Sequence, residues 1–153
     1  MLTVSRFATT EHEDKKLCFY GNLIANIAFT TQFDRAYANL LVRLGQGLSY
    51  RQLCLLAILA RMEISGGSSL RKRDDRNDVA TLGPSTVAIL FELYYLYGQG
   101  LVNSGNVAVL SAAEIVPANF RIQGPGAALF KLMELKWIWA EPGDLNPVNS
   151  LLS

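Results

Sequence analysis

The chain has 153 residues, of which 50% are hydrophobic and 18% are charged, so it is poorer in charge than an average soluble domain. Its 14 basic and 13 acidic residues give a net charge of +1, which excludes a strongly basic nucleic-acid-binding surface over the whole chain. This length suits one compact domain, and the apolar excess can fill a core and leave surface for a partner.

Two helices are predicted in the first third of the chain. Thr10 and Glu13 form a capping box, which predicts a helix over about 11–29 with one apolar face. A second helix is expected over about 34–45, where Asp34 provides the N-cap and two glycines follow the last apolar residue.

The clearest helix start is at Ser49, where Gln52 completes another capping box. The helix that follows is apolar on nearly all sides, so we expect it to lie at the centre of the fold. A polar linker is predicted over 65–83. Pro84 then favours the first turn of a fourth helix, which is expected to end at Gly98.

Beyond the fourth helix the apolar spacing changes. Residues 101–110 predict two short strands around a Ser-Gly turn, and residues 120–122 predict a third strand. A last helix is expected from Pro125 to about residue 140. The tail, 141–153, contains two prolines and is expected to be loose.

These elements predict a mainly α protein: a helical bundle with a winged-helix-like part that carries a small β-hairpin. The single domain would consist of an N-terminal helical extension (11–47), the winged-helix-like part (48–140) and the loose tail (141–153).

Charged side chains are densest at 71–78, with 4 basic and 3 acidic residues. The carboxylates oppose phosphate binding, because affinity for nucleic acid comes from basic groups that neutralise phosphates. A solvated loop is the favoured interpretation, and a flexible segment without a partner is the least favoured. The alternative is contact with nucleic acid or another anion through Arg71, Lys72 and Arg73, together with Arg51. The fourth helix has no Arg, Lys, Asn or Gln to read base edges, which argues against duplex binding on the usual face.

No catalytic residue, cofactor site or metal site is predicted. His12 stands between Glu11 and Glu13 and is interpreted as solvated. Cys18 and Cys54 lie inside apolar helical patterns without metal-ligand spacing, which is typical of reduced thiols in a cytoplasmic protein. No apolar run reaches the roughly 20 residues that span a bilayer. We therefore expect neither an enzyme nor a membrane span.

Four aromatic residues are candidates for an interface: Tyr95, Tyr97, Trp137 and Trp139. Residues two apart on a helix point to different sides, so both tryptophans are not expected in one core. Exposed aromatic side chains are common anchors of protein interfaces, although core packing is the more frequent role.

The segments "FYGNLIANIAF", "ANLLVRLGQGLSYRQLCLLAIL", "ELYYLYGQGLV" and "FRIQGPGAALFKLM" follow one another in an order that resembles the Abi-alpha-type family of bacterial proteins linked to abortive infection. Gln123 stands where that family usually has Thr. The resemblance implies a role in phage defence or a related bacterial process, and it implies no catalytic residue.

The sequence thus predicts a non-enzymatic cytoplasmic module that self-associates or binds a protein partner. The alternative is a winged-helix-like regulator that binds nucleic acid through the basic cluster at 71–76. The two predictions differ in whether association depends on apolar surface or on salt-sensitive basic groups.

Overall fold

The computed structural model describes residues 2–67, 69–74 and 81–153, with side chains described from Thr10 onward. It confirms the predicted mainly helical class with one small antiparallel sheet. In chain order, the elements are α1 (Leu2–Phe29), α2 (Arg35–Gly47), α3 (Tyr50–Ser65), α4 (Pro84–Gly98), β1 (Val102–Asn103), η2 (Ala112–Glu114), η3 (Pro117–Asn119), β2 (Arg121–Ile122), α5 (Gly124–Leu132), η4 (Leu135–Ala140) and α6 (Pro142–Leu152).

The predicted caps fix the starts of α2 and α3. The Asp34 carboxylate accepts a hydrogen bond from the Tyr37 backbone N–H at 2.7 Å. Ser49 and Gln52 exchange both hydrogen bonds of the capping box. Since each cap satisfies backbone N–H groups that lack a partner within the helix, these starts follow from local sequence.

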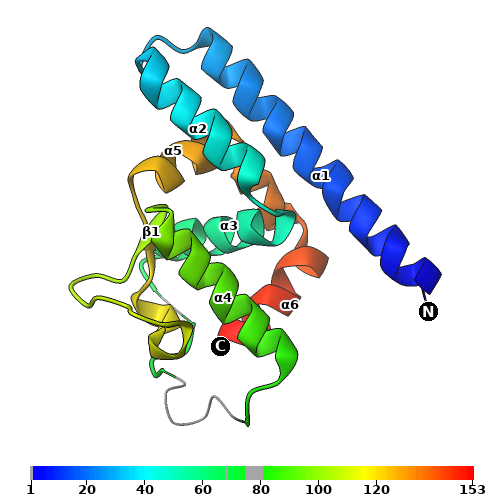
Figure 1. Ribbon diagram of the computed structural model, residues 1–153, viewed down its shortest axis with the longest axis vertical. Helices are drawn as coiled ribbons and strands as arrows, with labels where there is room; N and C mark the ends of the chain where they lie inside the picture. The colour runs from blue at the N-terminus through cyan, green and yellow to red at the C-terminus, as the bar shows by residue number, and fades with distance from the viewer. Residues whose placement is uncertain (1, 68, 75–80) are drawn as a thin grey trace.

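The central position predicted for α3 is confirmed. Every residue from 52 to 60 is buried, and α3 contacts α1, α4, α5, α6 and η4. In Figure 1, α3 lies in the middle of the body, and α1 runs beside α2 along one side. The crossing of α1 and α2 is close, because a Cβ atom on Gly45 would overlap the Leu23 side chain. Within the described ranges, no helix combines the length and apolarity needed to cross a bilayer.

The strand predicted at 120–122 is confirmed as β2, but the hairpin predicted within 101–110 is wrong. The strand β1 instead pairs antiparallel with β2, with Val102 opposite Ile122. Gly126 lets this arrangement form, because a Cβ atom there would overlap the backbone oxygen of Leu101. The partner of β1 comes from far along the chain, and alternating residues within one segment carry no information about such a pairing.

The last predicted helix is broken in two. The helix α5 ends at Leu132, and Glu134 has a left-handed backbone conformation with φ of 58° before η4 begins. Side chains of α1 stabilise this break: the amide of Asn26 donates to the Leu132 carbonyl at 2.8 Å, and that of Asn22 donates to the Met133 carbonyl at 3.3 Å. The backbone carbonyl groups at the end of α5, which lack partners within the helix, thus accept hydrogen bonds from a distant segment of the chain.

The prediction of a loose tail is also wrong. Residues 142–152 form α6, which packs on α3 and α4. Pro142 occupies the first turn, where proline is favoured. Three residues of α6 are buried at helical spacing: Leu145, Val148 and Leu152. The tail is therefore part of the hydrophobic core. The first helix likewise begins before the predicted start, at Leu2.

Candidate functional site

A pocket with a volume of about 390 Å³ opens where α1, α3 and α6 meet the start of α4. All four helices contribute polar or ionisable groups, among them Ser85 of α4 and Asp144 of α6, and apolar groups come mainly from α6. The lining residues are His12, Tyr50, Arg51, Cys54, Ser85, Gly143, Asp144, Pro147, Val148 and Leu151.

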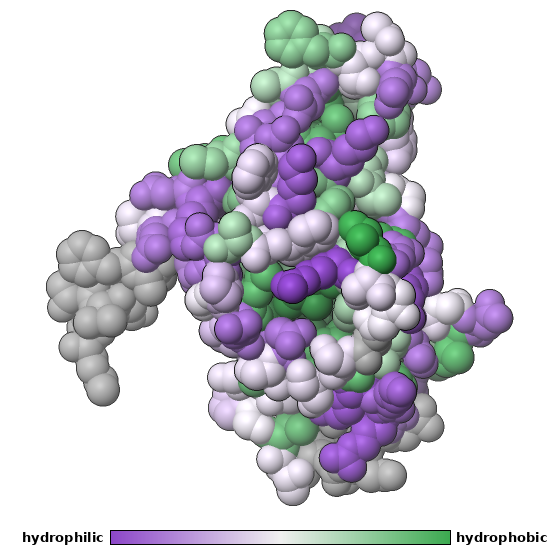
Figure 2. All heavy atoms as spheres, turned by 180° about the vertical axis from the view of Figure 1, so that it is seen from behind, coloured by the Kyte–Doolittle hydropathy of each residue, from purple (hydrophilic) through white to green (hydrophobic). Residues whose placement is uncertain are grey.

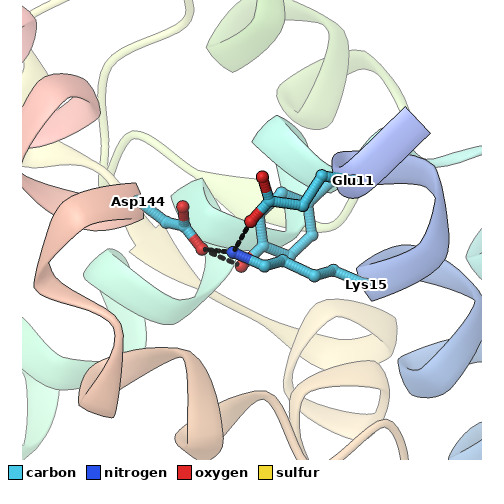
Figure 3. Close-up of polar contacts among 4 residues, drawn as sticks. Glu11, Lys15 and Asp144 are labelled. Atoms are coloured by element: carbon cyan, nitrogen blue, oxygen red, sulfur yellow. Dashed lines mark hydrogen bonds and ion pairs between the residues drawn. The ribbon is translucent and has the colours of Figure 1, made fainter. Parts of the chain in front are cut away.

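A hydrogen-bonded network that includes the pocket residues Tyr50 and Asp144 joins three helices. The Asp144 Oδ2 atom accepts from Lys15 Nζ at 2.8 Å and from the Tyr50 hydroxyl at 2.7 Å. Lys15 Nζ also lies 3.2 Å from a Glu11 carboxylate oxygen. Figure 3 shows the ammonium group of Lys15 between the two carboxylates. The network therefore holds α6 against α1 and α3.

The network shifts the pKa of each of its central members. Burial raises the pKa of the Asp144 carboxyl, but hydrogen bonds from Lys15 and Tyr50 outweigh it and leave the pKa below its ordinary value. The hydrogen bond to Asp144 raises the pKa of Lys15 despite partial desolvation. Burial, followed by the hydrogen bond to Asp144, raises the pKa of Tyr50 far above its ordinary value. At neutral pH, Tyr50 is a neutral phenol that donates to a carboxylate.

The shift at Asp144 predicts a loss of stability in acid. A carboxyl whose pKa is lowered by folding stabilises the fold above its unfolded pKa, and this stabilisation disappears as the pH falls through the folded pKa. Asp144→Asn should therefore lower the urea midpoint at pH 7, and the difference from wild type should narrow at about pH 3. Urea unfolding of both proteins at the two pH values checks this. An equal difference at both pH values would contradict the ionic role of Asp144.

The Cys54 thiol of the pocket is not activated as a nucleophile. Burial raises the pKa of the Cys54 thiol to about 12, so the thiolate that a nucleophile requires is not formed near neutral pH. His12 lies with its ring 5.2 Å from that of Tyr50 and is exposed. Among the described residues, no group of three or more His, Cys, Asp or Glu side chains is placed to hold a metal ion.

The four predicted basic contact residues do not form one surface around this pocket. Arg51 lines it, and its Nη2 atom donates to the Ser85 carbonyl at 3.4 Å. Arg71, Lys72 and Arg73 are not among the lining residues. The backbone of Arg71 is anchored by hydrogen bonds to Leu152 and Ala118, whereas Lys72 and Arg73 are exposed. The rest of the charged segment, at 75–78, lies outside the described residues.

The predicted aromatic residues divide into two kinds. Trp137 is 60% exposed, and Tyr95 is 43% exposed. Trp139 is partly buried and donates its indole N–H to the Ala57 carbonyl at 2.8 Å. Tyr97 is partly buried too, and its ring packs against Phe120. Of these four residues, Tyr95 and Trp137 are therefore the more accessible to a partner.

A further apolar surface lies on α1, on the side turned away from the core. Ideal helical spacing places Gly21 and five other uncharged residues on one side of the helix, and all six are exposed. Leu17 is 62% exposed and Ile24 is 42% exposed, and Phe29 next to this side is 90% exposed. Figure 2, the view from behind that of Figure 1, shows hydrophobic side chains scattered among polar ones. We call this side the outer face of α1; it consists of Leu17, Cys18, Gly21, Ile24, Ala25 and Ala28.

Comparisons with models of known protein families, with curated proteins and with solved structures find no match for this chain. The geometry of the pocket and of the outer face of α1 therefore carries the functional argument.

Proposed function

We propose that this protein is a non-enzymatic self-association module in which the outer face of α1 packs against the same face of a second copy. The observation that carries the proposal is the exposure of this face, which has no charged residue from Leu17 to Ala28. A contiguous apolar surface of this kind is typical of a protein interface.

The outer face is complementary to itself in an antiparallel arrangement. If Gly21 of one copy lies opposite Gly21 of the other, Leu17 lies opposite Ala25 and Ile24 lies opposite Cys18. Each large side chain then faces a small one, as close helix packing requires. Gly21 itself has open space where a side chain would be, so the two backbones can approach there.

Charge at the ends of the face slightly favours the antiparallel arrangement. Glu11 and Phe29 lie on the same side of an ideal helix, about five turns apart. The antiparallel register brings Glu11 of one copy close to Phe29 of the other. Phe29 borders a hollow of about 560 Å³ that Lys131 and Lys136 also line, and both lysines are exposed. Glu134 also lines this hollow, which leaves it one excess positive charge, and Glu11 is already paired with Lys15, so the charge contribution to this orientation is small.

Light scattering coupled to size-exclusion chromatography tests the proposal. At tens of micromolar protein in reducing buffer, we expect a mass near twice the 16.8 kDa of the chain. Cys18 is exposed, so the reducing agent ensures that any dimer is non-covalent. A monomer at this concentration would contradict the proposal.

We also propose a cytoplasmic location, which is supported by two free thiols, one exposed and one buried. The link to phage defence stays a prediction from the sequence resemblance, and challenge of expressing bacteria with phage is its test.

The nucleic-acid alternative has weaker support, because Arg51 lies in a pocket that Lys72 and Arg73 do not line. Salt-sensitive binding to DNA or RNA that disappears when Lys72 and Arg73 become alanine would support the nucleic-acid alternative.

A further inference from the structure

We propose that the pocket between α1, α3 and α6 binds a small amphipathic monocarboxylate, with its carboxylate on Arg51 and its apolar body against α6. The volume of about 390 Å³ lies within the range of small-molecule sites. The pocket combines one cationic side chain with an apolar wall, which are the two features that such a ligand requires.

Arg51 is the anion-binding group of the proposal. Its Nε atom is buried and has no hydrogen-bond acceptor among the described residues. Its one described side-chain hydrogen bond, to the Ser85 carbonyl, is long at 3.4 Å. A buried donor without an acceptor is costly, and a carboxylate accepts from a guanidinium through two parallel hydrogen bonds. Since Arg51 also lines the pocket, its guanidinium can hydrogen-bond to a carboxylate bound there.

Ser85 adds to the preference for an anion at the same end of the pocket. It lies in the first turn of α4, where the N-cap, Gly83, provides no side-chain hydrogen bond. The N-terminal end of a helix carries partial positive charge and favours a nearby anion. Arg51 and the first turn of α4 thus act on one side of the pocket.

The apolar wall comes from Pro147, Val148 and Leu151 of α6. Cys54 contributes a neutral thiol beside them, because burial keeps it protonated. These groups can contact a hydrocarbon chain or an aromatic ring but offer no hydrogen bond to its carbon atoms.

The Asp144 carboxylate, which also lines the pocket, disfavours a second negative charge. Asp144 is ionised there, since hydrogen bonds from Lys15 and Tyr50 stabilise its charged form. A dianion such as phosphate would place charge in the same small pocket as this carboxylate, which is unfavourable. The site therefore fits one carboxylate with an apolar body better than a compact dianion.

Isothermal titration calorimetry with sodium octanoate at pH 7 is the test. We expect saturable binding of one octanoate per chain, weaker binding of 1-octanol and octylamine, and no competition from inorganic phosphate. Arg51→Gln should reduce the octanoate affinity by about tenfold or more, because it removes the charged donor. Arg43→Gln is the matched control: Arg43 is an exposed arginine on α2 outside the pocket, and its replacement should leave binding unchanged.

A second variant distinguishes a loss of octanoate binding from a loss of folding. Ser85→Asp places a carboxylate in the exposed first turn of α4, where it favours the helix, yet it should repel octanoate from the pocket. Octanoate binding that is unchanged in both Arg51→Gln and Ser85→Asp would overturn the proposal. So would equal affinity for 1-octanol, or no saturable binding up to about 10 mM. His12, which lines the pocket, lies on the side of α1 opposite Gly21, so these results do not depend on pairing of the outer face.

Discussion

Replacement of Leu56 by alanine is expected to lower the free energy of unfolding by about 2–5 kcal/mol. Leu56 lies in the middle of α3 with 0% of its surface exposed. Because α3 contacts α1, α4, α5, α6 and η4, surrounding helices cannot all move inward to fill the space that the side chain leaves. Urea-induced unfolding followed by circular dichroism measures the loss.

Ile64→Ala is the matched control for this prediction. Ile64 lies on the same helix, but its side chain is 73% exposed, so we expect a change within about 0.5 kcal/mol. A loss below about 1 kcal/mol for Leu56→Ala would mean that α3 is not the centre of the core.

Replacement of Ile24 by glutamate is expected to weaken self-association by about a hundredfold or more. In the proposed dimer each Ile24 side chain packs against Cys18 of the other copy. A carboxylate at that position would lose its hydration without gaining a partner, and the two-fold symmetry applies this cost twice. Sedimentation velocity over a range of protein concentrations measures the change in the dissociation constant.

The folded monomer should tolerate this substitution, because Ile24 is 42% exposed and lies away from the core. Ile64→Glu is the control, since it introduces the same charge at an exposed isoleucine on α3. We expect it to leave the dissociation constant unchanged. If wild type and Ile24→Glu had equal dissociation constants, the outer face of α1 would not be part of the interface.

Local signals in the sequence were sufficient to predict most of the helices. Asp34 and the pair of Ser49 and Gln52 cap their helices as expected, and Pro84 starts α4. Each of these signals acts within one helical turn, on backbone groups a few residues away. The burial of α3 followed from its apolar residues on all sides.

The parts that sequence could not predict depend on distant partners. The break after α5 is stabilised by Asn22 and Asn26 of α1. The strand β1 pairs with β2, which lies about 20 residues further along the chain. The candidate pocket was missed for the same reason. His12 and Asp144 belong to opposite ends of the chain, and the tail that holds Asp144 was expected to be loose. The proline at 142 was a usable signal, since proline at a first helical position favours a helix start.

Disulfide formation at Gly21 tests the pairing of the outer faces most directly. In a Cys18→Ser background, Gly21→Cys should form a covalent dimer under mild oxidation, because the two copies of residue 21 face each other. Native Cys18 should cross-link poorly, since its two copies lie about 9 Å apart along the helix axes, beyond the reach of a disulfide. Gly98→Cys, at the exposed end of α4, gives the rate of random collision. Rapid cross-linking of Gly21→Cys alone is the predicted result, and a rate equal to that of Gly98→Cys would contradict the account.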